Sequence, residues 1–244
     1  MKVDVNKLSE RVDISIPLRF DGPQPNAFGA ERAIARPLGD TRDGSSVNYE
    51  QYVITPHCNG THTECVGHIT DERVSVRNCL KDIIMQAFVV SVEPEVVASG
   101  DSVISRRSLE QVLADVPAND AALIVRTLPN DASKLERVYD DSDVPPYFSA
   151  NAMRFIFDCG VKHLLVDLPS VDRLFDDGKL ENHRIFWNVN EGSRSINEKT
   201  RINSTITELI FVPDTVSDGR YRLNLQIAPF DSDAAPSRPV LFTT

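Results

Sequence analysis

The sequence predicts a single domain of mixed α and β structure, and three observations support this fold class. The chain has 244 residues, enough for one domain with a sizeable core. Hydrophobic residues make up 41% of it and charged residues 25%, as in ordinary globular proteins, which excludes a largely disordered chain. Segments with a period of two and segments with one apolar helical face follow one another without an internal repeat or a linker. We therefore assign residues 1–244 to one domain.

The N-terminal part of the chain predicts strands separated by a long loop. Residues 12–16 alternate between apolar and polar side chains and stop at Pro17, as expected for a strand and its end. Residues 21–46 are rich in Gly, Pro, Asn and Asp and predict a loop, which at this length is usually functional or mobile. Residues 47–54 alternate again, and the apolar run at 86–93 suits a buried strand.

The C-terminal part combines helices with strands. Ser108 starts a capping-box pattern, and Ser149 can cap a helix that ends near Cys159. The strands expected here are residues 121–127, 161–167, 205–212 and 221–227. A strand, a helix and a strand in this order indicate a crossover with parallel pairing. The last two strands are predicted to be joined by a hairpin-like turn.

Composition also excludes several classes of partner. Lys and Arg number 26 against 36 Asp and Glu, a formal net charge of −10, so nucleic-acid binding is not expected. No apolar run approaches the roughly 20 residues of a membrane span. Residues 1–6 have no apolar segment of the kind found in an export signal. The four cysteines form no CxxC pair, so without an export signal we expect reduced thiols in a cytoplasmic protein. The partner that we expect is a small-molecule substrate.

Residues 57–68 carry the most informative motif of the chain. This stretch holds three of the five histidines, together with Glu64, two cysteines and two glycines. Imidazole, thiolate and carboxylate are the ligand types that Zn²⁺ accepts, whereas Mn²⁺ prefers oxygen and nitrogen. His62 and Glu64 are two residues apart and would share one face of a strand. The stretch therefore predicts a metal or catalytic site, and the alternative is a chance cluster of hydrogen-bonded core histidines.

The motif resembles the signature of the cyclase family, which includes bacterial kynurenine formamidases and isatin hydrolases. That signature reads His-x-Gly-Thr-His-x-Asp-x-Pro-x-His. Aligned on Gly60-Thr61-His62, its second histidine falls on His62, its acid on Glu64 and its last histidine on His68. The resemblance extends over most of the chain, through residues 13–15, 124–127, 146–172 and 236–240.

This resemblance implies a fold, an activity and a set of roles. The fold would be one domain with a central mixed, partly barrel-like sheet and flanking helices. The activity would be metal-dependent hydrolysis of an amide or formamide C–N bond. His62, Glu64 and the later His183 would bind the metal, Zn²⁺ rather than Mn²⁺, and His68 would transfer a proton. Relatives tend to be homo-oligomers, so the resemblance implies at least a homodimer in which residues 21–46 cover the neighbour's site.

The chain departs from the family pattern at several ligand positions. Cys58 stands at the place of the first histidine, with His57 one residue earlier, and either can supply a ligand. The late acidic ligand aligns with Asn203 or Ser204, and Glu208 comes four or five residues late. One metal ion, two or none are therefore all compatible with the sequence. The alternative function is a metal-free lyase or cyclase using His68 and Glu64, or a binding protein with an altered centre.

Five further residues each have a structural and a functional interpretation. Arg126 can clamp a substrate carboxylate or form an internal ion pair. Trp187 can line a pocket for an aromatic substrate or fill the core. Asp172 can cap a helix or belong to the site. We expect His163 to be structural and Cys65 to be a small core thiol.

Overall fold

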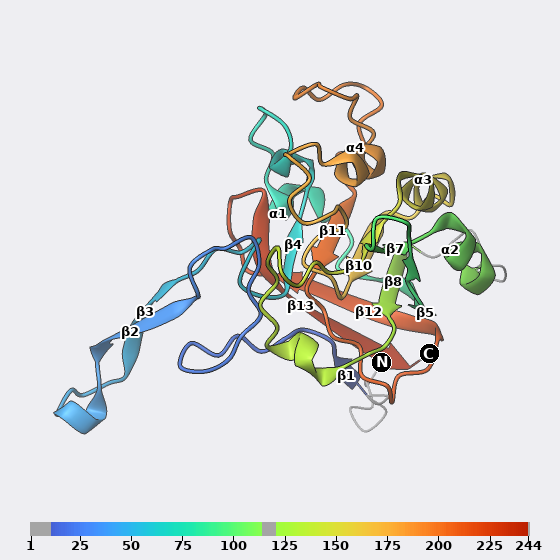
Figure 1. The fold of residues 1–244 in the computed structure, drawn as a ribbon. Coiled ribbons are helices and arrows are strands. Elements are labelled where there is room, and N and C mark those ends of the chain that lie inside the picture. The colour runs from blue at the N-terminus through green and yellow to red at the C-terminus, as the bar shows by residue number, and fades with distance from the viewer. Residues whose placement is uncertain (1–10, 114–120, 244) are drawn as a thin grey trace, which may run out of the picture.

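The computed structural model describes residues 11–113 and 121–243; residues 1–6, examined above for an export signal, lie outside this part. Its central sheet has the strand order β1-β13-β12-β5-β8-β10-β11-β4. A further pairing of β13 with β4 closes seven of these strands into a barrel, to which β1 adds at one edge. The predicted mixed, barrel-like sheet in one domain is confirmed (Figure 1).

The elements have the following bounds. The strands of the barrel sheet are β1 (Arg11–Asp13), β4 (His62–Glu64), β5 (Ile84–Val92), β8 (Ala122–Thr127), β10 (His163–Val166), β11 (Thr205–Glu208), β12 (Gly219–Ile227) and β13 (Ala234–Thr243). The helices are α1 (Val76–Cys79), α2 (Arg106–Leu113), α3 (Ala150–Asp158) and α4 (Glu181–Trp187). Two small sheets pair β2 (Ile34–Gly39) with β3 (Tyr49–Val53), and β7 (Ser102–Ile104) with β6 (Glu95–Val96) and β9 (Tyr147–Phe148).

The strands β5, β8, β10 and β11 are parallel, and this accounts for the apolar runs within β5, β8 and β10. All residues of β8 are buried because the strand has a hydrophobic cluster on each face. Leu123 and Val125 pack in the cluster that contains the buried side chains of α2, α3 and α4. Ala122 and Ile124 pack in a second cluster with side chains of β5, β12 and β13. The crossover predicted between residues 121–127 and 161–167 is thereby confirmed.

Three details of the sequence-based elements were wrong. The segment 205–212 does not form a hairpin with 221–227, because β11 lies between β10 and β4 while β12 pairs with β5 and β13. The pairing buries all of β11 inside the barrel wall. Helix α2 begins before Ser108, whose backbone N–H donates to the Ser105 hydroxyl. The loop predicted at 21–46 contains β2, which extends into the hairpin with β3.

This β2–β3 hairpin, hereafter the arm (residues 34–53), projects away from the barrel (Figure 1). Every residue of β3 is exposed. Leu38, Val47, Tyr49 and Tyr52 are each more than half exposed. A two-stranded hairpin is marginally stable in water by itself, so a pair of strands with these side chains suits a surface that another molecule covers.

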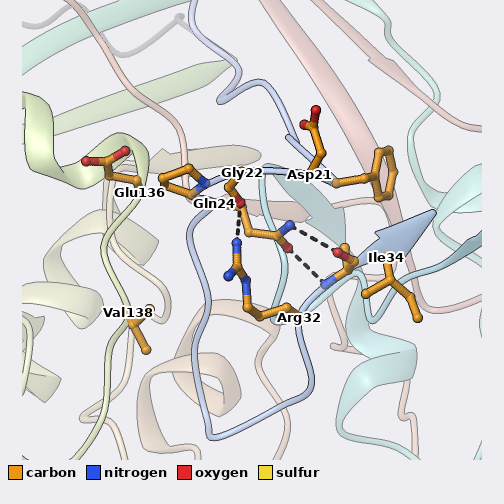
Figure 2. A pocket seen from close by; sticks show the side chains of 10 residues that line it. Asp21, Gly22, Gln24, Arg32, Ile34, Glu136 and Val138 are labelled. Carbon is orange, nitrogen blue, oxygen red and sulfur yellow. Dashed lines mark hydrogen bonds between the residues drawn. The ribbon is translucent and has the colours of Figure 1, made fainter.

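The base of the arm is anchored on the body by a buried glutamine. The Gln24 carboxamide donates to the carbonyl of Ala33 at 3.1 Å and accepts from its N–H at 2.9 Å (Figure 2). Beside it lies an open hollow of about 600 Å³, lined by residues that include Arg32 and Glu136. The Phe20 ring contacts the Tyr52 ring of the arm, with centroids 4.7 Å apart. These contacts fix the direction in which the arm leaves the barrel.

Among the described residues, no helix is both long and apolar enough to cross a membrane.

Candidate metal centre

Strand β4 carries the centre of the motif, and its register with β11 sets the geometry. His62 and Glu64 point to one side of β4, as their spacing predicts, and both are buried. Thr63 between them faces the other side, where its hydroxyl lies 2.8 Å from that of Thr207. In the antiparallel pairing of β4 with β11, His62 stands opposite Glu208. Three ionisable side chains therefore meet on one face of two adjacent strands.

Two residues of the Gly-Thr-His motif shape the backbone around this face. Gly60 has a φ of +152°, a conformation that L side chains rarely adopt, and its carbonyl accepts from His62 Nδ1 at 2.9 Å. The Thr61 hydroxyl accepts from the N–H of Ile16 at 2.8 Å and donates to the carbonyl of Leu209. Thr61 thereby ties β4 to the backbone that directly follows Glu208.

Glu208, which follows the aligned positions of the late acid at Asn203 and Ser204 by four or five residues, lies at this site. Its Oε2 lies 3.4 Å from His62 Nε2, and its Oε1 lies 3.8 Å from His183 Nε2. Oε1 also accepts from the N–H of Val171 at 3.0 Å, which holds the carboxylate in place. The interstrand register brings Glu208 opposite His62, and counting residues along the chain does not reveal that register.

His183 reaches the same face from α4, and Asp172 orients it. The Asp172 carboxylate accepts from His183 Nδ1 at 2.6 Å and from the N–H of Asn182 at 2.7 Å, so it fixes both the ring and the start of α4. The other ring nitrogen, Nε2, lies 3.0 Å from Glu64 Oε1. Asp172 therefore contacts both the start of α4 and the His183 ring, so the structure supports its structural interpretation and its interpretation as a site residue.

His57 and His68 approach the other carboxylate oxygen of Glu64, the one that does not face His183. His57 Nδ1 lies 3.1 Å and His68 Nε2 lies 3.9 Å from Glu64 Oε2. Their second ring nitrogens both face Asp233 Oδ2, at 2.9 Å from His57 Nε2 and 3.6 Å from His68 Nδ1. The two rings lie against each other, with centroids 4.3 Å apart and an interplanar angle of 31°. Sequence reasoning missed Asp233, because nothing near it in the chain marks it.

All four imidazoles follow one pattern. Each directs one ring nitrogen outward to an oxygen of Gly60, Asp172 or Asp233, and the other inward to Glu64 or Glu208. Metal-binding histidines characteristically have such an outer carboxylate or carbonyl, which fixes the ring and its tautomer. The arrangement is therefore built to present nitrogen lone pairs to a common centre.

Among the described residues, two buried atoms at this centre lack a partner with hydrogen-bond geometry, and both are typical metal donors. They are His62 Nε2 and Glu64 Oε2. Unpartnered buried polar atoms are rare and costly in native proteins, so they call for an explanation. Donor atoms of His62, Glu64 and Glu208 lie within 4.8 Å of one another, as do those of His57, Glu64 and His68. Imidazole and carboxylate donors at these distances fit a divalent cation.

The ionisable side chains at the centre shift one another's pKa values. Burial by itself would raise the pKa of Glu64, but the positive charges of His68 and His183 hold it well below its usual value. Burial would likewise lower the pKa of His183, and the Glu64 and Asp172 carboxylates raise it well above its usual value instead. For His57, the Asp233 and Glu64 carboxylates outweigh burial and raise the pKa to about 10. The Glu64 carboxylate is therefore held ionised, as a carboxylate that binds a metal ion must be.

Exposure divides the centre into a buried floor and an open mouth. The side chains of Glu64 and His183 are each 1% exposed, and those of His62 and Glu208 are also buried. His57, His68 and Asp233 are 26%, 28% and 25% exposed. A substrate would therefore meet His57, His68 and Asp233 before it reaches the floor.

Cys58 is buried close to Glu208, and both its burial and that carboxylate raise the pKa of its thiol. In the part of the chain that the structure describes, the Cys58 sulfur joins neither of the two donor groups, whereas His57 joins one of them. Of the two alternatives for the missing first histidine, the geometry favours His57.

The remaining residues have structural contacts. Arg126 binds Asp218 and the carbonyls of Pro213 and Val216, which accounts for its guanidinium without a substrate. Trp187 is fully buried, and its indole N–H donates to the carbonyl of Ser204. His163 is buried with Nδ1 2.9 Å from the Thr205 hydroxyl. Cys65 is buried in a small cluster with Cys79.

The chain is similar to known proteins over most of its length. The model of the family named Cyclase matches residues 12–173. Kynurenine formamidase of Bacillus cereus (strain ATCC 10987 / NRS 248) is 30% identical over 239 residues, covering 96% of this chain and 98% of the relative. The same enzyme of Bacillus anthracis is 28% identical over the same span.

Solved structures show the same fold at lower identity. Isatin hydrolase A from Labrenzia aggregata, bound to benzyl benzoate, superposes with a TM-score of 0.70 and 14% identity, over 99% of this chain and 96% of that one. A "predicted metal-dependent hydrolase" from Bacillus stearothermophilus superposes with a TM-score of 0.67 and 15% identity, over 96% and 98% of the two chains.

Proposed function

Because the chain belongs to the cyclase family, we propose that it is a metal-dependent hydrolase that cleaves the C–N bond of an amide or a formamide. The observation that carries the proposal is the ring of four outward-anchored imidazoles around Glu64 and Glu208. The relatives named kynurenine formamidase and isatin hydrolase supply the substrate class.

His62, Glu64, Glu208 and His183 would hold the ion on the buried floor, with His57 beside them at the mouth. A bound divalent ion supplies a polarised substrate carbonyl and a water whose pKa falls to about 7. Imidazole and carboxylate ligands suit Zn²⁺ and also admit Mn²⁺. Glu64 directs one oxygen to His183 and the other to His57 and His68, so it has the geometry to contact one ion or two.

His68 is placed to move the proton. It lies at the mouth, within 3.9 Å of Glu64 through Nε2, on a 3₁₀ turn at Val66–His68. A Cβ on Gly67 would collide with the carbonyl oxygen of Val74, so glycine permits the close approach that sets this turn. An imidazole there can take a proton from the attacking water and give it to the leaving nitrogen.

Replacing Glu208 with glutamine tests the proposal at a residue that only the structure assigns. The amide keeps the shape but loses the charge, so the bound metal and the hydrolysis of a formylated aniline and of an isatin-like lactam should both fall. Glu191→Gln, an exposed change on the α4 side, is the matched control and should leave both unchanged. A Glu208→Gln protein with full metal content would contradict the role of Glu208, and a wild type without metal would favour the metal-free lyase or binding protein.

We also propose that the arm covers a second copy of this chain, as the exposed apolar side chains of Leu38, Tyr49 and Tyr52 suggest. The expected result is a dimer or larger oligomer in light scattering at micromolar concentration. Changing Leu38 and Tyr49 to serine should shift the protein toward the monomer without altering the helix and strand content. A monomeric wild type would contradict this proposal.

A further inference from the structure

We propose that Asp233 is a positioning residue that holds His57 and His68 as a stacked pair at the mouth of the centre. Through this contact it fixes the His68 ring with Nε2 directed inward. The kinetic part of this inference rests on the proposed function, whereas the structural part stands on its own.

The barrel closure places Asp233 at this point. Asp233 directly precedes β13, whose Ala234 pairs with Glu64 of β4. The Asp233 carbonyl accepts from the N–H of Cys65 at 3.0 Å, so its backbone is fixed beside the motif. The Ser232 hydroxyl donates to Oδ1 at 3.1 Å, which leaves Oδ2 facing the two histidines. Asp233, about 170 residues away from the motif at 57–68 in sequence, thereby lies at the outer side of the site.

The two histidines span the gap between two carboxylates. Glu64 Oε2 lies on the inner side and Asp233 Oδ2 on the outer side, and each ring directs one nitrogen to each of them. Both carboxylates only accept hydrogen bonds, and Asp233 is the nearer of the two for each ring, at 2.9 Å against 3.1 Å for His57 and 3.6 Å against 3.9 Å for His68. A neutral ring therefore keeps its one hydrogen on the nitrogen that faces Asp233. For His68 this nitrogen is Nδ1, and Nε2 is left to exchange a proton with the substrate side. In the part of the chain that the structure describes, the Asp233 carboxylate is the outer oxygen that faces the partly exposed ring of His68.

The inner histidines provide a comparison within the same centre. Asp172 performs the same task for His183, with a hydrogen bond of 2.6 Å. Gly60 performs it for His62 through its carbonyl. Asp233 differs because it serves two rings at once and because it lies at the mouth, where a substrate must pass. Its removal should therefore affect proton transfer more than metal retention.

The structural test uses nitrogen-15 spectra of the histidine rings in metal-free protein, recorded above the pH at which the His68 signals stop changing. Signals are assigned with His57→Gln and His68→Gln variants. In the wild type, His68 should carry its hydrogen on Nδ1, and in Asp233→Ala the hydrogen should shift toward Nε2. Asp231→Ala, an exposed change two residues earlier, is the control and should resemble the wild type. An unchanged His68 tautomer in Asp233→Ala would overturn the inference, whatever the activity.

The kinetic test separates positioning from binding. Asp233→Ala should lower kcat by about 10–100-fold, as expected for loss of an outer carboxylate, with KM and metal content close to those of the wild type. In a His68→Ala background, Asp233→Ala should cause a smaller loss than it does in the wild type, because the part of its effect that passes through His68 is already gone and only the part through His57 remains. Asp233→Asn, which keeps the size of the side chain, provides the same readout if the alanine variant folds poorly. If Asp233→Ala lowered kcat by the same factor in the His68→Ala background as in the wild type, the inference would be overturned. An inactive wild type would refute the proposed function, and the spectral result would then decide the inference.

Discussion

Replacing His62 with alanine is expected to remove bound metal and hydrolytic activity together. His62 is buried, and its Nε2 has no hydrogen-bond partner in the described part of the chain, although Glu208 lies 3.4 Å away. A metal ion is the partner that such a nitrogen lacks, so its loss should empty the floor of the centre. Activity should fall by more than about 100-fold, beyond the loss typical for an outer-sphere residue.

The matched control for His62→Ala is His163→Ala. His163 is also a buried histidine in the barrel sheet, but its Nδ1 already contacts the Thr205 hydroxyl. Its replacement should lower the free energy of unfolding by creating a cavity, while metal content per folded chain stays the same. Elemental analysis combined with thermal unfolding distinguishes the two variants. Equal metal content in both would mean that His62 is a packing residue.

Replacing His68 with alanine is expected to lower kcat by about 10²–10⁴-fold while the metal content is unchanged. His68 is 28% exposed at the mouth, whereas the floor residues Glu64 and His183 are each 1% exposed. The floor retains His62, Glu64, Glu208 and His183, so the ion keeps its ligands. Steady-state kinetics and elemental analysis of the same preparation provide both values. If His68→Ala lost metal as fully as His62→Ala, His68 would be a ligand and not the proton-transfer residue.

Local patterns were sufficient to predict much of the fold. The apolar run at 121–127 became the buried strand β8, and Ser149 caps α3 by accepting from the N–H of Ala152. These features depend on neighbours in sequence, which is why period and capping signals detect them. The partners of β11 and β12 were predicted wrongly, since strand pairing depends on contacts far apart in sequence.

The site was likewise predicted where residues close in sequence determine it and missed where distant strands bring residues together. The spacing of His62 and Glu64 correctly placed them on one face. The resemblance to the cyclase family predicts His183 as a metal ligand, and its Nε2 lies 3.0 Å from Glu64 Oε1, while the ligand role itself stays a prediction. Glu208 and Asp233 needed the structure, because the register of β11 and β13 against β4 brings them in. The sequence left His57 and Cys58 as equal alternatives, because only the direction of each side chain distinguishes them.

Elemental analysis of tag-free protein decides whether these imidazoles and carboxylates hold a metal ion. We predict at least one equivalent of a divalent transition metal per chain, either as purified or after incubation with Zn²⁺ or Mn²⁺ followed by removal of the excess. His62→Ala and Glu208→Gln should lose this metal, while His163→Ala and Glu191→Gln should retain it. A folded wild type that retains neither ion would contradict the assignment of these imidazoles and carboxylates as a metal centre.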